Sequence, residues 1–124
     1  MRRGSLIASF GYAVQGVCYA FRTQRNMRIH TAAAVAVITA AALLHLSWSR
    51  WVVLLLAITL VMAMELMNTA LESVVDLASP ELHPLAKAAK DTAAGAVLLA
   101  AVFAVAAGII VFYRPLMDLL GSGG

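Results

Sequence analysis

Charged residues are scarce in this sequence. Only 12% of its 124 residues are Asp, Glu, Lys or Arg, whereas 63% are hydrophobic. Soluble globular domains are about half apolar and about a quarter charged, so the composition excludes a soluble domain and indicates an integral membrane protein. A chain of this length forms one domain of a few helices, so any chemistry must come from those helices and their short loops.

Cysteine is nearly absent, and two familiar phosphate-binding motifs are missing. The single Cys18 excludes an intrachain disulfide. The sequence contains neither a P-loop nor a glycine-rich kinase loop, so phosphate sites of those two kinds are not expected. The net charge of +3 does not indicate nucleic-acid binding, because most basic residues flank apolar runs, where membrane topology and anionic lipid explain them.

Apolar periodicity predicts one surface helix and three spanning helices. In residues 5–24 apolar side chains recur every three or four positions, while Gly11, Gln15 and Gly16 disfavour a spanning helix. We therefore expect an amphipathic helix in the membrane interface rather than a cleaved signal peptide. Transmembrane helices are predicted at about 29–46, 51–77 and 85–113, with a flexible tail at 116–124. The expected fold class is all-α, as a single membrane domain over residues 1–124.

The basic residues predict how these helices are oriented. Arg50 and Arg114 lie on one side of the predicted membrane. The other basic residues all lie on the opposite side: Arg2, Arg3, Arg22, Arg25, Arg28, Lys87 and Lys90. Because cytoplasmic segments carry an excess of Lys and Arg, the N-terminus and the loop before the last helix are expected in the cytoplasm. We expect a multi-pass protein of the bacterial inner (cytoplasmic) membrane.

Four polar residues share one face of the second spanning helix. Glu65, Asn68, Glu72 and Asp76 follow a mostly apolar run and fall within about 80° of one another around the helix axis. At about 1.5 Å per residue, Glu65 lies roughly 21 Å from Trp51 within a ~30 Å hydrocarbon core. A charge at that depth is unfavourable, so a carboxylate there is a candidate functional group.

The graded depth of these carboxylates suits phosphoryl transfer to a lipid alcohol. A carboxylate shielded from water binds a proton more readily, which suits a general base for a hydroxyl group. Carboxylates at the aqueous end of the helix suit Mg²⁺, which takes oxygen ligands and bridges phosphates. Lys87 and Lys90, at the start of the last helix, suit a polyphosphate. The pattern therefore fits Mg²⁺-dependent phosphoryl transfer from a nucleotide to a hydroxyl group on a lipid head.

Simpler interpretations stay open at this point. Glu65 and Asn68 could bond across helices and hold an oligomer together, or Glu65 could be the centre of a proton or ion pathway in such an oligomer. Glu72 and Asp76 could be ordinary charges at a solvated helix end, and His83 an ordinary loop residue. None of these alternatives explains why the polar residues share one helix face and one side of the membrane.

The sequence resembles the prokaryotic diacylglycerol kinase family, small integral-membrane lipid kinases that include the undecaprenol kinases. Three stretches carry the resemblance: residues 25–30 (RNMRIH), 65–76 (ELMNTALESVVD) and 81–91 (ELHPLAKAAKD). It covers about residues 5–114 and implies a homotrimer whose active sites are shared between neighbouring protomers near the cytoplasmic interface. The first and third stretches are closer to the undecaprenol kinases than to the diacylglycerol-preferring branch.

Carried over by position, the resemblance implies a role for each polar residue. Glu65 is implied as the catalytic base toward the lipid hydroxyl, Asn68 as the residue that positions the reacting groups, and Arg28 as a contact near the lipid head. Glu72 and Gln24 are implied as Mg²⁺ ligands that also adjoin the nucleotide. The further nucleotide contacts that it implies are Tyr12, Asp76, Glu81, Leu82, His83, Lys90 and Asp91.

Gln24 departs from the family pattern, in which this position is often Glu. A carboxamide offers an oxygen without charge, so the metal is expected to depend more on Glu72 and on phosphate oxygens. Ser5 and Ala8 stand where relatives carry basic residues, which removes nucleotide contacts from the start of the surface helix. We predict phosphorylation of undecaprenol by Mg-ATP. Diacylglycerol is the second candidate substrate, and a non-catalytic partner subunit is the alternative that Gln24 leaves open.

Overall fold

The structure is a computed structural model that describes residues 5–123, which fold into helices joined by short connections. The helices are α1 (Leu6–Thr23), α2 (Arg25–Leu43), α3 (Trp48–Ala78) and α4 (Pro84–Gly123). No strand occurs over residues 5–123, so the all-α fold class is confirmed. Arg2 and Arg3, which entered the topology argument, and Gly124, at the end of the predicted tail, lie outside the described residues.

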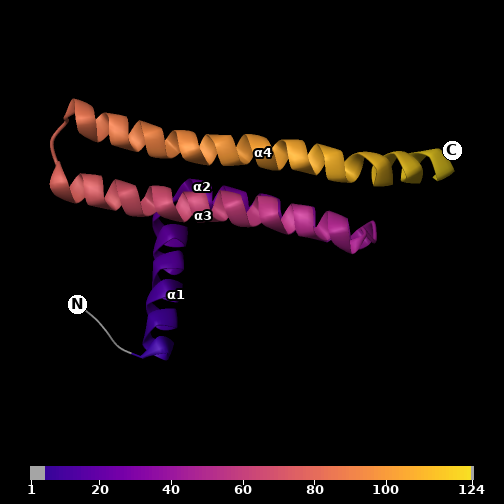
Figure 1. Cartoon of the computed structure of the whole chain (residues 1–124), viewed down its shortest axis with the longest axis horizontal. Helices are drawn as coiled ribbons and strands as arrows, with labels where there is room; N and C mark the ends of the chain where they lie inside the picture. The colour runs from indigo at the N-terminus through magenta and orange to yellow at the C-terminus, as the bar shows by residue number, and fades with distance from the viewer. Residues whose placement is uncertain (1–4, 124) are drawn as a thin grey trace.

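Helices α2, α3 and α4 run side by side, whereas α1 leaves them at a steep angle (Figure 1). Each of these three helices is long and apolar enough to cross a membrane. Many of their large apolar side chains are exposed, for example Leu56, Leu98 and Ile110. A surface of this kind suits hydrocarbon rather than water, while the helical backbone bonds satisfy the polar main chain.

A single residue, Gln24, separates α1 from α2. Its extended backbone (φ −117°, ψ 115°) ends the first helix and begins the second, so the chain turns sharply there. Arg28 holds this joint, because its guanidinium donates a hydrogen bond of 2.6 Å to the carbonyl oxygen of Phe21 in the last turn of α1. At the other end of α1, the Ser5 hydroxyl accepts from the Ala8 N–H (3.2 Å), as expected of an N-cap.

Helix α2 begins and ends earlier than the predicted range 29–46. Its first turn is polar because the helix extends beyond the hydrocarbon core, and apolar content predicts only the part within the core. The end is set by His45, whose backbone is left-handed (φ 52°). The Leu46 N–H then donates to the Ala41 carbonyl (3.2 Å), which belongs to the hydrogen-bond pattern of a Schellman C-cap.

The prediction that the last helix ends at 113 was wrong. Helix α4 continues through Pro115 to Gly123, so the predicted tail is helical over 116–123. Proline removes a single helical donor, and the apolar residues after it allow the helix to continue, with a change of direction near its C-terminal end (Figure 1). Helix α3 also exceeds the predicted range 51–77, by three residues at its start and one at its end.

An apolar cluster fixes the three long helices at one end of the bundle. Ala41 at the end of α2, Leu46 in the following turn, Leu54 on α3 and Val111 on α4 are all buried together. Within a membrane, such packing stabilises the bundle through van der Waals contacts between the helices, because the lipid tails around them are as apolar as these side chains. The polar residues of α3 lie toward the opposite end of the same helices, beside the α1–α2 joint and the α3–α4 loop.

Candidate active site

The polar face of α3 is buried at Glu65 and Asn68 and becomes exposed toward Asp76. Glu65 is only 1% exposed, and Asn68 and Thr69 are buried beside it. The Thr69 hydroxyl donates to the Glu65 carbonyl (2.9 Å) in its own helix. Both carboxylate oxygens of Glu65 and the Oδ1 of Asn68 have no hydrogen-bond partner among the described residues. Because buried polar atoms normally have partners, these atoms identify a candidate functional site.

His30 of α2 is the residue that approaches Glu65. Its Nε2 lies 3.1 Å from the Oε2 of Glu65, as an ion-pair contact without an aligned hydrogen bond. The sequence analysis included His30 in a family stretch but assigned it no role. Antiparallel register could have identified it, because Gln24 meets Glu72 and His30, six residues later, meets Glu65, seven residues earlier.

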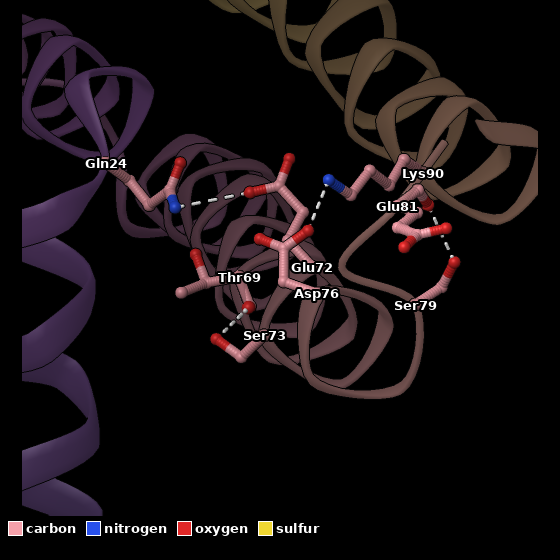
Figure 2. A network of polar contacts seen from close by, with 8 residues as sticks. All are labelled: Gln24, Thr69, Glu72, Ser73, Asp76, Ser79, Glu81 and Lys90. Carbon is pink, nitrogen blue, oxygen red and sulfur yellow. Dashed lines mark hydrogen bonds and ion pairs between the residues drawn. The ribbon is translucent and has the colours of Figure 1, made fainter. Parts of the chain in front are cut away.

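At the polar end of α3, side chains from the α1–α2 joint, α3 and α4 converge (Figure 2). The Nε2 of Gln24 donates to the Oε1 of Glu72 (3.3 Å), which brings together the two residues predicted as metal ligands. One turn further along α3, the Oδ1 of Asp76 forms an ion pair with the Nζ of Lys90 on α4, at a distance of 2.5 Å. Figure 2 shows Glu72 and Asp76 between Gln24 on one side and Lys90 on the other.

A cleft opens where α3, the 79–83 loop and α4 meet. Its volume is about 650 Å³. Six of the predicted nucleotide-binding residues line it: Asp76, Glu81, Leu82, His83, Lys90 and Asp91. The Nδ1 of His83 accepts from the Leu85 N–H (3.0 Å) and so caps the start of α4. The helix start and the two lysines of the cleft favour anions, but each lysine is paired with a carboxylate, Lys87 with Asp91 and Lys90 with Asp76.

Tyr12 and Arg28 lie away from this cleft. Tyr12 lies in the middle of α1, about three turns before the joint, and is half exposed. Arg28 lies at the joint itself, where its guanidinium bonds the end of α1. Neither residue lines the cleft. The sequence analysis did not foresee that Arg28 stabilises the angle between α1 and α2.

The Gln24–Glu72 pair fits a metal ion only with help from other ligands. Among the described residues, no three His, Cys, Asp or Glu side chains are grouped to hold a metal. Proteins commonly bind Mg²⁺ through one or two carboxylates, with water and substrate phosphates completing the shell. The carboxylate of Glu72, with the amide of Gln24 in contact and Asp76 one turn away, satisfies that minimal requirement.

Comparison with known proteins identifies the family. The family model described as prokaryotic diacylglycerol kinase matches residues 11–112. A diacylglycerol kinase from Synechocystis sp. is 59% identical over 117 residues, which cover 94% of this chain and 67% of the relative. An undecaprenol kinase from Bacillus subtilis is 45% identical over 108 residues, which cover 87% of this chain and 88% of the relative. A diacylglycerol kinase from Escherichia coli is 33% identical over 100 residues (81% and 82%).

The matched region contains the polar face of α3, the Gln24 joint and the α3–α4 cleft. These relatives are lipid kinases, a class that takes its phosphate from ATP, so the comparison favours the enzyme over a proton or ion pathway. Three long apolar helices agree with a multi-pass membrane protein. The chain therefore belongs to the prokaryotic diacylglycerol kinase family and is a bacterial membrane kinase that phosphorylates a lipid alcohol with ATP.

Proposed function

We propose that Glu65 accepts the proton of a lipid hydroxyl while the γ-phosphate of ATP is transferred to that oxygen. The observation that carries this proposal is the burial of Glu65, at 1% exposure, two helical turns from Glu72 at the polar end of α3. A lipid hydroxyl approaches such a carboxylate from the hydrocarbon side, and the nucleotide approaches from the aqueous side. The substrates therefore meet without either leaving its own phase.

The transfer is a direct displacement. The O–H bond of the lipid breaks and its proton passes to Glu65, while the lipid oxygen bonds to the γ-phosphorus. The bond from that phosphorus to the bridging oxygen breaks, and ADP leaves with this oxygen. Asn68, one turn from Glu65, orients the hydroxyl through its buried amide. The protein contributes positioning and a proton acceptor, which are the main requirements of phosphoryl transfer.

We assign ATP to the α3–α4 cleft. Lys90 offers positive charge to the phosphates, and its contact with Asp76 (2.5 Å) orients it across the cleft. Glu81, Leu82, His83 and Asp91 form the walls of this site. Tyr12 would contact the nucleotide from α1, and Arg28 would lie near the lipid head.

Mg²⁺ would be held by Glu72, by the Oε1 of Gln24 and by phosphate oxygens. When bound, it would neutralise charge on the transferred phosphoryl group. Rotation of the Gln24 amide about its last bond would exchange the nitrogen that now faces Glu72 for the oxygen. The proposal thus assigns the protein one charged and one neutral ligand.

We further propose a homotrimer in the bacterial inner membrane, with the N-terminus in the cytoplasm. The family resemblance supports the trimer, and the unpartnered atoms of Glu65 and Asn68 are consistent with a site that a neighbouring protomer and the substrates complete. Seven of the nine basic residues lie on the side of the N-terminus, and this excess supports the orientation. The active site then faces the compartment that contains ATP.

Undecaprenol is the substrate we favour. The relative named undecaprenol kinase aligns over 88% of its own length, and the stretches at 25–30 and 81–91 support that branch. Diacylglycerol is the second candidate, because the relative named diacylglycerol kinase has the higher identity of 59%. Both are membrane alcohols, so the same base and nucleotide site serve either one.

A labelling assay separates these candidates. Purified protein in lipid bicelles receives γ-labelled ATP, Mg²⁺ and either undecaprenol or diacylglycerol. We expect labelled undecaprenyl phosphate, formed with a higher kcat/KM than labelled phosphatidate. Labelling of diacylglycerol alone would reverse the substrate assignment and leave the kinase intact. If neither lipid were labelled, the proposed function would fail.

A carboxylate at position 24 should strengthen metal binding. In Gln24→Glu a second charge stands beside Glu72, so the Mg²⁺ concentration for half-maximal activity should fall, by about tenfold for ~1.4 kcal/mol of added attraction. A magnesium titration at fixed ATP measures this concentration.

Gln24→Leu is the matched control. It removes the amide oxygen and should raise the required Mg²⁺ concentration. If all three proteins shared one magnesium requirement, position 24 would not be a metal ligand.

A further inference from the structure

An apolar cavity of about 290 Å³ lies between α2, α3 and α4 on the membrane side of the site. Its walls are Ala, Val, Leu, Ile, Met and Gly side chains from the three helices, such as Val37, Met62 and Ala104. Among the described residues that line it, His30 is the one with a polar side chain. His30 thus stands between the apolar interior of the bundle and the carboxylate of Glu65.

The contact of His30 with Glu65 is asymmetric. The Nε2 lies 3.1 Å from Oε2, and Oε1 has no hydrogen-bond partner among the described residues. The imidazole is 25% exposed and Glu65 is 1% exposed, so the histidine is the accessible member of the pair. One carboxylate oxygen is therefore engaged from α2, and the other is left for a further partner.

The other polar groups near Glu65 do not compete for this position. Thr69 uses its hydroxyl on the carbonyl of its own helix (2.9 Å). Glu72 is bonded to Gln24 (3.3 Å) at the aqueous end. Asn68 lies on the same face of α3, and its Oδ1 has no hydrogen-bond partner among the described residues. His30 is accordingly the residue whose polar side chain contacts the Glu65 carboxylate among the described residues.

We propose that His30 is a positioning residue for phosphoryl transfer: its Nε2 holds Oε2 of Glu65, so that Oε1 accepts the proton of the lipid hydroxyl. This inference rests on the proposed role of Glu65 as the base. The covalent step is unchanged, since the proton passes from the lipid oxygen to Oε1 and His30 neither gains nor loses a bond. What His30 supplies is orientation, which limits rate when a reacting group is misplaced by even about 1 Å.

A purely structural pairing makes different predictions. If His30 only offset the burial of the Glu65 charge, its loss would reduce the stability of the fold, and surviving protein would keep its turnover. A positioning role instead lowers kcat, leaves the KM for Mg-ATP unchanged, and is restored by any side chain that returns a donor to the location of Nε2.

Three substitutions test this distinction. His30→Leu removes the donor, and His30→Asn places an amide near the ring position of Nδ1, short of Oε2. His30→Gln extends its amide to about the location of Nε2. His45→Asn, in the left-handed turn after α2, is the matched control for loss of a histidine, since asparagine tolerates that backbone.

We expect kcat to fall about 10- to 100-fold in His30→Leu and His30→Asn, with the KM for Mg-ATP unchanged. His30→Gln should recover most of the lost turnover, and His45→Asn should match the unmodified protein. Wild-type kcat in His30→Asn, or equal losses in His30→Asn and His30→Gln, would overturn the inference. The Asn–Gln pair keeps the test valid if His30→Leu does not fold.

The same assay distinguishes failure of the proposed function from failure of the His30 inference alone. Failure of the function would appear as an unmodified protein that labels no lipid, and the role of His30 would then fall with it. Failure of the His30 inference alone would appear as an active unmodified protein whose His30 variants turn over equally fast.

Discussion

Replacement of Glu65 by glutamine should lower kcat for lipid phosphorylation about 10²- to 10⁴-fold, the range typical for loss of a general base. Glutamine keeps the shape of the side chain but does not accept the hydroxyl proton. Because Glu65 is 1% exposed and its oxygens lack hydrogen-bond partners among residues 5–123, the neutral amide should not weaken the fold. Turnover of γ-labelled ATP into lipid phosphate measures the loss.

Nucleotide binding should survive this change. The α3–α4 cleft lies toward the aqueous end of α3, and Glu65 is not among its lining residues, so calorimetric titration should give an unchanged Kd for Mg-ATP. Asp118→Asn, on the C-terminal part of α4, is the matched carboxylate control and should retain full activity. A Glu65→Gln variant that kept more than about a tenth of kcat would remove Glu65 from the role of base.

Replacement of Glu72 by glutamine should also nearly abolish activity, but for a different reason. Glu72 is the charged member of the proposed metal pair, so its loss should reduce metal affinity by more than the ~10- to 100-fold that loss of an outer-shell partner causes. Because the Nε2 of Gln24 lies 3.3 Å from the Oε1 of Glu72, the variant would offer the ion two neutral amides, one at position 24 and one at position 72. Turnover at increasing Mg²⁺ concentration measures this effect.

The response to metal distinguishes the two acidic residues. Activity of Glu72→Gln should rise as Mg²⁺ increases into the high millimolar range, because mass action offsets weaker binding. Activity of Glu65→Gln should not. Ser73→Ala, next to Glu72 on α3, removes a hydroxyl that bonds only its own helix (3.0 Å) and should keep the ordinary magnesium requirement. A Glu72→Gln variant with an unchanged requirement would contradict the metal assignment.

The helices and the polar face of α3 were predictable because both patterns are local. Apolar runs between 29 and 113 indicated three spanning helices, and the spacing of Glu65, Asn68 and Glu72 placed them on one face. Burial of Glu65 and Asn68 agrees with that placement. Sequence separation was no obstacle here, since every residue in the pattern belongs to one helix.

Contacts between helices could not be predicted in the same way. The approach of His30 to Glu65 depends on the register of α2 against α3, and the apolar pattern of either helix permits several registers. The bond of Arg28 to the end of α1 depends on where that helix stops. The continuation of α4 beyond Pro115 departs from the general rule that proline ends a helix.

The one-residue joint at Gln24 connects the tilt of α1 to a side chain of the proposed metal pair. The backbone of this residue sets the tilt of α1, and its side chain touches Glu72. We therefore expect a change in the tilt of α1, such as one caused by a change in bilayer thickness or curvature, to shift the residues proposed to hold the metal.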